Sequence, residues 1–218
     1  MNPTTTALLA ALAVAPAVAR PDSTAGCHCF QDRSFEPDRP GAADAYILAT
    51  TRSSLLSAAF GVPKKDLVMA VMTGTQPEDL WIAYWAAARG KRSAASLLQA
   101  RKGAGSWKAV LGTAGPLEPA FDAALARGAP DADLCALAVD DVLVHRARAL
   151  PAALRSLRSA GANTEETVVA TVLSAKLAAP VLPLVAQVKA GRATWGSVLN
   201  DAGIEPRELD GLVRAMVR

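Results

Sequence analysis

The chain has 218 residues, of which 51% are hydrophobic and 20% are charged, and its net charge at neutral pH is +3. This composition is typical of a globular protein and excludes an extensively disordered chain. So small a net charge does not indicate nucleic acid or any other particular class of partner.

Residues 1–19 are predicted to be a signal peptide. The apolar run TALLAALAVAPAVA ends in Ala17-Val18-Ala19, a small-x-small cleavage pattern, although no Lys or Arg precedes it. The run is too short and too rich in Ala to span a bilayer convincingly, and no later stretch is long and apolar enough. We therefore expect an exported protein of the bacterial periplasm without a transmembrane helix. A buried N-terminal helix is the alternative.

Two similar segments, GSWKAVLGTAG and ATWGSVLNDAG, place Trp107 and Trp195 88 residues apart. The same offset superimposes Thr75–Glu78 on Asn163–Glu166, and both are capping-box patterns that start helices. The sequence therefore predicts a tandem duplication of a module of about 88 residues, with copies at residues 42–130 and 131–218. An extended N-terminal segment, residues 20–41, precedes the first copy.

Each copy is predicted to contain six helices, and no stretch alternates polar and apolar residues as a strand would. The fold class is therefore all-α, with about twelve helices. In the first copy the expected landmarks, in chain order, are an Asp44 cap and a Gly61 stop, a start at Pro63 and an end near Gly74, the segment LWIAYWAAA ending at Gly90, a helix from about Ser93 to a left-handed Gly103, a short helix from Ser106 to Gly115, and PAFDAALARG. In the second copy, Pro151, Thr194 and Gly203 are the corresponding landmarks.

Trp107 and Trp195 are predicted to be core residues of the two copies. The surrounding Gly, capping residue and short helix also resemble a DNA-binding helix-turn-helix. The recognition helix would then be EPRELDGLVRA, whose acidic side chains would repel phosphate as much as its arginines attract it. We therefore expect no nucleic-acid partner.

The three cysteines are disulfide candidates, because export implies an oxidising compartment. A bond between Cys27 and Cys29 would be strained, so the expected pairing joins Cys135 to one of them and staples the N-terminal segment to the second copy. Lipidation of Cys27, which follows the small residues STAG, is an alternative that would anchor the protein to a membrane surface.

The same CHC segment is a candidate metal site. Cys27, His28 and Cys29 are soft donors suited to copper(I) or zinc, and His145 or Cys135 is a further candidate ligand. Covalent haem is excluded, because its attachment motif has two residues between the cysteines. No cofactor is otherwise predicted.

One helix face in the first copy is a candidate for binding a partner protein or an anionic surface. Trp81, Tyr84 and Trp85 share that face at helical spacing, and basic residues follow without an acidic one between them. The candidate basic residues are Arg89, Arg92, Arg101 and Lys102. The alternative is that the aromatic residues form core and the basic residues a solvated face.

The sequence does not support an enzyme. Its histidines, His28 and His145, belong to no motif with a catalytic mechanism. The leading hypothesis is an exported, non-catalytic helical binding or scaffold protein of unknown ligand. The alternative is a small metal-binding or thiol-redox protein that uses the CHC segment.

Overall fold

The computed structural model describes residues 30–112 and 115–217. These ranges hold twelve α-helices and one short 3₁₀ helix, without a strand, which confirms the all-α prediction. No helix in the same ranges combines the length and apolar character needed to cross a bilayer. In chain order the helices are α1 (Asp44–Phe60), α2 (Lys64–Met72), α3 (Pro77–Ala87), α4 (Ala94–Ala104), α5 (Trp107–Leu111), α6 (Pro119–Ala126), α7 (Asp131–Ala147), α8 (Pro151–Ser159), α9 (Thr164–Leu177), α10 (Leu182–Lys189), α11 (Trp195–Asp201), η2 (Pro206–Glu208) and α12 (Leu209–Met216).

The helices form two series of six with similar spacing. From α7 to α9, each helix begins 87 residues after its counterpart in α1 to α3, and α10 and α11 begin 88 residues after α4 and α5. The change from 87 to 88 falls in the connection after α3 and α9, where α9 is the longer helix. This spacing is compatible with the predicted duplication, which itself stays a prediction.

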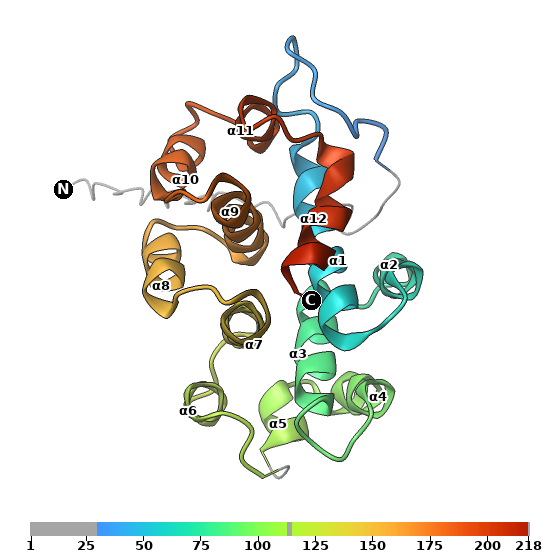
Figure 1. Ribbon diagram of the computed structural model, residues 1–218. Helices are drawn as coiled ribbons and strands as arrows, with labels where there is room; N and C mark the ends of the chain where they lie inside the picture. The colour runs from blue at the N-terminus through green and yellow to red at the C-terminus, as the bar shows by residue number, and fades with distance from the viewer. Residues whose placement is uncertain (1–29, 113–114, 218) are drawn as a thin grey trace, which may run out of the picture.

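Long helices from the two series pack crosswise. Helix α1 of the first series contacts α9 of the second, and α3 of the first contacts α7 of the second. Figure 1 shows α1 and α3 as one column beside a second column made by α7 and α9. The core therefore runs continuously through both series, and Trp81, Trp85, Trp107 and Trp195 are among its largest fully buried side chains. The prediction that Trp107 and Trp195 are core residues is confirmed.

Helix α1 is buried on every side, although its sequence is rich in Ser and Thr. The run from Thr50 to Ser57 is wholly buried. Short hydroxyl side chains are tolerated there because they bond locally: Thr51 Oγ1 donates to the Ile47 carbonyl, and Ser57 Oγ donates to the Val62 carbonyl. Arg52, also buried, forms an ion pair with Glu165 of α9, so the two series are joined by charge as well as by apolar packing.

Several predicted helix ends are confirmed. Ser106 and Thr194 cap α5 and α11 through their side-chain oxygens, and Gly61 ends α1 in the left-handed conformation. The capping box of Asn163 and Glu166 is present at the start of α9.

Other predicted ends are wrong. The pattern Thr75–Glu78 forms no capping box, because α3 begins at Pro77 with Gln76 as a cap that has no side-chain hydrogen bond. Gly103 lies inside α4, and the left-handed residue that ends this helix is Gly105. The helix therefore ends two residues later than predicted.

Asp44 was predicted to cap its own helix, but it does not. It is the first residue of α1, and its carboxylate accepts hydrogen bonds from the backbone amides of Trp195 (3.2 Å) and Gly196 (2.8 Å) at the start of α11. These two amides are among those that a helix N-terminus leaves without an internal partner. Burial raises the pKa of Asp44 above its usual value, although the two amide bonds oppose that shift. A carboxylate of the first helix therefore fixes the eleventh.

The segment before α1 crosses α11 at close range. Thr194 Oγ1 donates to the Pro40 carbonyl at 2.7 Å. A Cβ on Gly196 would collide with the Pro40 carbonyl oxygen and would lie 3.3 Å from the Phe35 ring. The absence of a side chain at this helical position is what permits the contact.

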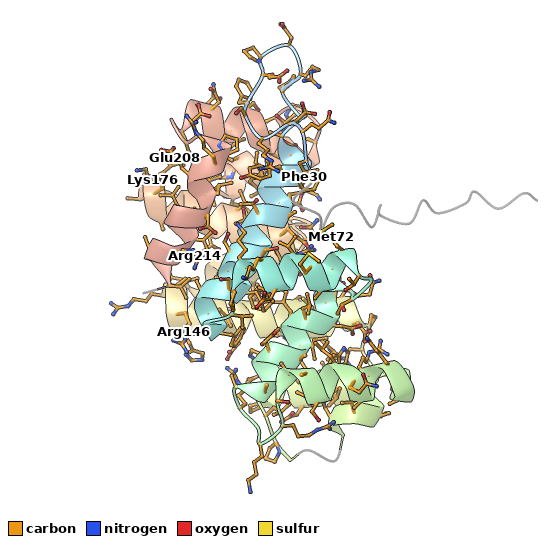
Figure 2. All side chains as sticks on the ribbon, turned by 90° about the vertical axis from the view of Figure 1, so that its right-hand side faces the viewer. Phe30, Met72, Arg146, Lys176, Glu208 and Arg214 are labelled. Carbon is orange, nitrogen blue, oxygen red and sulfur yellow. The ribbon has the colours of Figure 1, made fainter. Side chains whose placement is uncertain are left out.

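The C-terminal helix returns to the first one. Figures 1 and 2 show α12 lying along α1. Asp210 of α12 accepts hydrogen bonds from Ser54 (2.5 Å), Lys64 (3.0 Å) and Arg214 (2.8 Å). Although burial opposes the charge, these bonds hold the pKa of Asp210 well below its usual range, whereas burial lowers the pKa of Lys64.

We predict opposite effects for two Gly→Ala substitutions in helices. Gly196→Ala should lower the unfolding free energy by about 1–3 kcal/mol, because the new methyl group overpacks the Pro40 contact. Gly211→Ala, in α12, should raise it by up to about 1 kcal/mol, because no atom lies within 4 Å of the new Cβ and alanine favours the helix. Urea unfolding of both variants measures the difference, and equal stabilities would show that the Pro40 contact is not made.

We also predict that Asp210 contributes to acid sensitivity. Its folded pKa lies below the unfolded value of about 3.9, so its stabilising effect is full above that pH and is lost as the pH falls toward the folded pKa. Asp210→Asn should therefore lower the thermal midpoint at pH 7 and flatten its fall between about pH 4 and pH 2. Asp201→Asn, at an exposed carboxylate of α11, is the matched control. Parallel melting curves for wild type and Asp210→Asn would contradict the prediction.

Candidate functional site

The predicted CHC metal site lies outside the described residues, so Cys27, His28 and Cys29 stay predictions. Its further candidate ligand, His145, is an exposed residue of α7 whose Nε2 lies 3.4 Å from the Asp141 carboxylate. No group of three or more His, Cys, Asp or Glu side chains is placed to hold a metal ion within residues 30–112 and 115–217.

Cys135 is a free thiol in the core. Its side chain lies on the buried face of α7 and is 3% exposed. Burial raises the pKa of this thiol well above its usual value, and the negative charges of Glu78 and Glu165 add to the shift. The geometry does not favour the predicted pairing with Cys27 or Cys29, because a second sulfur would have to enter the packed core.

The aromatic face predicted as a partner surface is not available. Trp81 and Trp85 are buried, and Tyr84 is half-buried and stacked on Phe60. The Trp85 indole donates to Asp141 of α7 at 3.0 Å, which ties α3 to the second series. The alternative interpretation, that this face is core, is the correct one. Helix α7 packs against α3 there, and Tyr84 remains partly exposed.

Three of the four basic residues predicted beside that face form ion pairs or hydrogen bonds within the chain instead. Arg89 stacks over the Trp85 ring at 4.2 Å and forms an ion pair with Asp141. Arg101 bridges Asp79 of α3 (3.2 Å) and Asp131 of α7 (2.5 Å). Arg92 donates to the Val110 carbonyl. Lys102 is exposed, so the structure does not gather these side chains into one binding surface.

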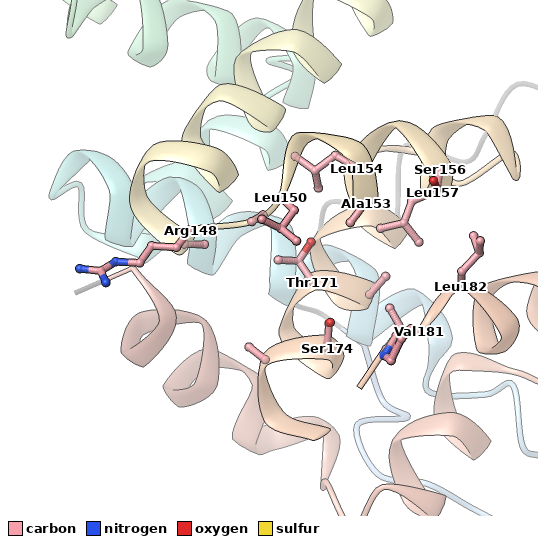
Figure 3. Close-up of a pocket in the computed structure, with 15 residues that line it drawn as sticks. Arg148, Leu150, Ala153, Leu154, Ser156, Leu157, Thr171, Ser174, Val181 and Leu182 are labelled. Carbon is pink, nitrogen blue, oxygen red and sulfur yellow. The ribbon is translucent and has the colours of Figure 1, made fainter. Parts of the chain in front are cut away.

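A cavity of about 390 Å³ opens in the second series, between the end of α7 and helices α8, α9 and α10. Its volume is within the range of about 300–1,000 Å³ typical of small-molecule sites. Figure 3 places Leu154 and Leu157 of α8 opposite Thr171 and Ser174 of α9. The full lining, which is predominantly apolar, is Ala147, Arg148, Ala149, Leu150, Ala153, Leu154, Ser156, Leu157, Ala170, Thr171, Ser174, Ala175, Pro180, Val181 and Leu182.

The cavity exists because two aromatic side chains of the first series have small counterparts in the second. Phe60 is the last residue of α1, and Ala147 is the last residue of α7. Tyr84 and Thr171 are each the eighth residue of their helices, α3 and α9. The Phe60 and Tyr84 rings stack with centroids 6.4 Å apart and fill the first series, whereas Ala147 and Thr171 line the cavity.

Two residues with positive φ lie on segments that form the cavity: Arg148 is part of its lining, and Ala178 lies between the lining residues Ala175 and Pro180. Within the described ranges, Arg148 (φ 54°) and Ala178 (φ 50°) are the non-glycine residues with positive φ. They cap the C-termini of α7 and α9, so both loops that lead into and out of the cavity walls carry this strain. The first series has glycine, Gly61, where the second has Arg148. Such conformations cost about 1–3 kcal/mol each and concentrate at functional sites.

Sequence reasoning missed this cavity, although a signal for it was present. The 88-residue offset pairs Trp81, Tyr84 and Trp85 with Val169, Val172 and Leu173, whereas the helix starts pair them with Val168, Thr171 and Val172. The one-residue difference hides the replacement of Tyr84 by a small hydroxyl residue. Aligning the helix ends at Gly61 and Arg148 would have revealed it.

Comparisons with known proteins do not identify the chain. No protein-family model, no curated protein and no solved structure matches it.

We predict that Cys135 is chemically inert in the folded protein. The reaction of N-ethylmaleimide requires an accessible thiolate, so labelling of Cys135 should be about a hundredfold slower in buffer than in concentrated urea. Mass spectrometry of the Cys135 peptide, with and without reduction, measures both the labelling and any cross-link. Equal labelling rates, or a disulfide to Cys27 or Cys29, would contradict the buried free thiol.

Proposed function

We propose that this chain is an exported, non-catalytic helical binding protein whose ligand occupies the cavity between α7 and α10. The observation that carries the proposal is the contrast between the two series. At corresponding helix positions, the first series has the stacked rings of Phe60 and Tyr84, and the second has Ala147 and Thr171 on the lining of an open cavity. An open apolar cavity lowers stability because its lining loses dispersion contacts. Retaining it, together with two strained loops, is expected of a site whose occupant compensates for the loss.

The chemistry of the lining supports binding rather than catalysis. The lining residues named above include no carboxylate, imidazole or thiol. Their hydroxyls already donate to backbone carbonyls: Thr171 to Thr167 (2.8 Å), Ser174 to Ala179 (3.0 Å) and Ser156 to Ala152 (3.0 Å). A hydroxyl nucleophile would need an adjacent general base to activate it.

Export is supported by the sequence of residues 1–19, which lies outside the described residues. The predicted cleavage after Ala19 would leave the cavity intact, because its lining lies between Ala147 and Leu182. Periplasmic location is part of the same proposal. The N-terminal mass of protein purified from its native host tests it, and a chain beginning at Met1 would contradict cleavage.

The binding proposal is tested by refilling the cavity with the rings of the first series. The probe is N-phenyl-1-naphthylamine, a neutral apolar dye whose fluorescence rises in dry sites. Ala147→Phe combined with Thr171→Tyr should weaken dye binding at least about tenfold, because the dye and the new rings compete for one space. Ala153→Leu, a smaller change on the same lining, should weaken it less.

The matched control is Ala132→Phe, an exposed position at the other end of α7. It adds the same ring without touching the cavity and should leave dye affinity unchanged. Circular dichroism and thermal melting establish that each variant is folded. Failure of the wild type to bind the dye, or equal binding by wild type and by both Ala153→Leu and the refilled variant, would overturn the proposal.

A further inference from the structure

We infer that the ligand of the cavity is a single-chain amphiphile with a carboxylate head group, held with its apolar chain between α8 and α9 and its head at the rim beside Arg148. The inference rests on the proposed binding function and adds the chemical class of the ligand.

The interior of the cavity suits a chain without polar groups. Leu154, Leu157 and Val181 are buried residues of its wall. The hydroxyls that face the cavity already donate their hydrogens to backbone carbonyls, so they have no hydrogen left to donate to a ligand. A hydrogen-bond acceptor such as a carboxylate placed among them would lose its bonds to water without recovering them from these hydroxyls. An anionic head group is therefore expected at the rim.

The shape of the site favours an elongated chain over a compact ring system. A shallower depression lined by Arg155 shares Ser156 and Leu182 with the cavity, so the apolar surface continues between α8 and α10. Leu150 and Leu182, 70% and 40% exposed, extend this surface at its two ends. Large apolar side chains exposed beside a cavity indicate surface that a ligand covers.

The charged side chains nearest the cavity are basic. Between Val142 and Asn200 the chain has seven Lys and Arg residues and two acidic ones, Glu165 and Glu166. Both acidic residues form ion pairs, Glu165 with Arg52 and Glu166 with Lys189. Arg148 on the cavity lining and Arg155 on the adjoining depression are exposed and have no carboxylate partner within residues 30–112 and 115–217. Arg146 of α7 and Lys176 of α9, on the same elements but outside both linings, are likewise exposed and without such a partner in those ranges. An anionic head group matches this rim.

Arg148 is the basic residue best placed to meet the head group. It lines the cavity, and Figure 3 shows its side chain extending outward from the mouth, where a solvated carboxylate would lie. It occupies a left-handed position that glycine holds in the first series, so the fold accepts strain to keep this side chain there. A guanidinium can bind both oxygens of a carboxylate.

The test uses the full chain loaded with N-phenyl-1-naphthylamine and three competitors that share one alkyl chain: decanoate, 1-decanol and decyltrimethylammonium. Decanoate should displace the dye at a concentration about tenfold lower than the cation, with the alcohol between them. The preference should shrink in 1 M salt, because salt screens charges at an exposed rim. Equal displacement by all three would overturn the inference while leaving the binding function standing.

A substitution at the rim separates charge from packing. Arg148→Asn removes the charge but keeps a residue that tolerates the left-handed conformation, and it should weaken displacement by decanoate about three- to fivefold while leaving 1-decanol unchanged. Arg127→Asn, at an exposed arginine that caps α6, removes the same charge away from the cavity and should change neither. Equal weakening of the acid and the alcohol by Arg148→Asn would contradict a head-group contact.

A bilayer could present the same chemistry, so vesicles containing phosphatidylglycerol form the last arm. The inferred ligand is a monomer enclosed by the cavity, and the refilled variant should lose decanoate binding without any change in vesicle co-sedimentation. Strong co-sedimentation that the refilled variant abolishes, with no displacement by decanoate monomers, would overturn the monomer assignment in favour of a membrane surface.

Discussion

The structure depends on the crosswise packing of α1 on α9 and of α3 on α7. Each of these long helices makes an extensive contact with the other series, and the two series share one continuous core. The Arg52–Glu165 and Arg89–Asp141 ion pairs lie at these two crossings. Arg52 is buried, and its pairing with Glu165 offsets the cost of burying its charge.

The same packing explains why one cavity is filled and the other open. The rings of Phe60 and Tyr84 support the outer face of α3, and Trp81 and Trp85 extend that support into the crossing with α7. The second series places valines at the positions of both tryptophans and uses a longer α9 to complete its crossing. The outer face of α9 therefore carries smaller side chains than that of α3, and the space between α8 and α9 remains open. On our proposal, the ligand binds in the second series, where smaller side chains take the places of the aromatic ones.

The sequence predicted several helix caps correctly, because they depend on neighbouring residues. It did not predict the contacts between helices. Ser106, Thr194 and Asn163 act as predicted, because a cap needs only the next three residues. Asp44 has the same chemistry, but its partner is a helix 151 residues further on, which no local pattern could indicate. Periodicity grouped Trp81, Tyr84 and Trp85 on one face correctly but could not say whether solvent or α7 covers it.

The return of α12 to α1 has a consequence for how the chain matures. Synthesis and any translocation run from the N-terminus, so α1 emerges first and its Ser- and Thr-rich surface must wait for the last helix to cover it. Until then Ser54 of α1 and Lys64 of α2 lack Asp210, the partner that α12 provides for both. On our proposal that the chain is exported, this late contact would keep part of the fold unformed until α12 has been made.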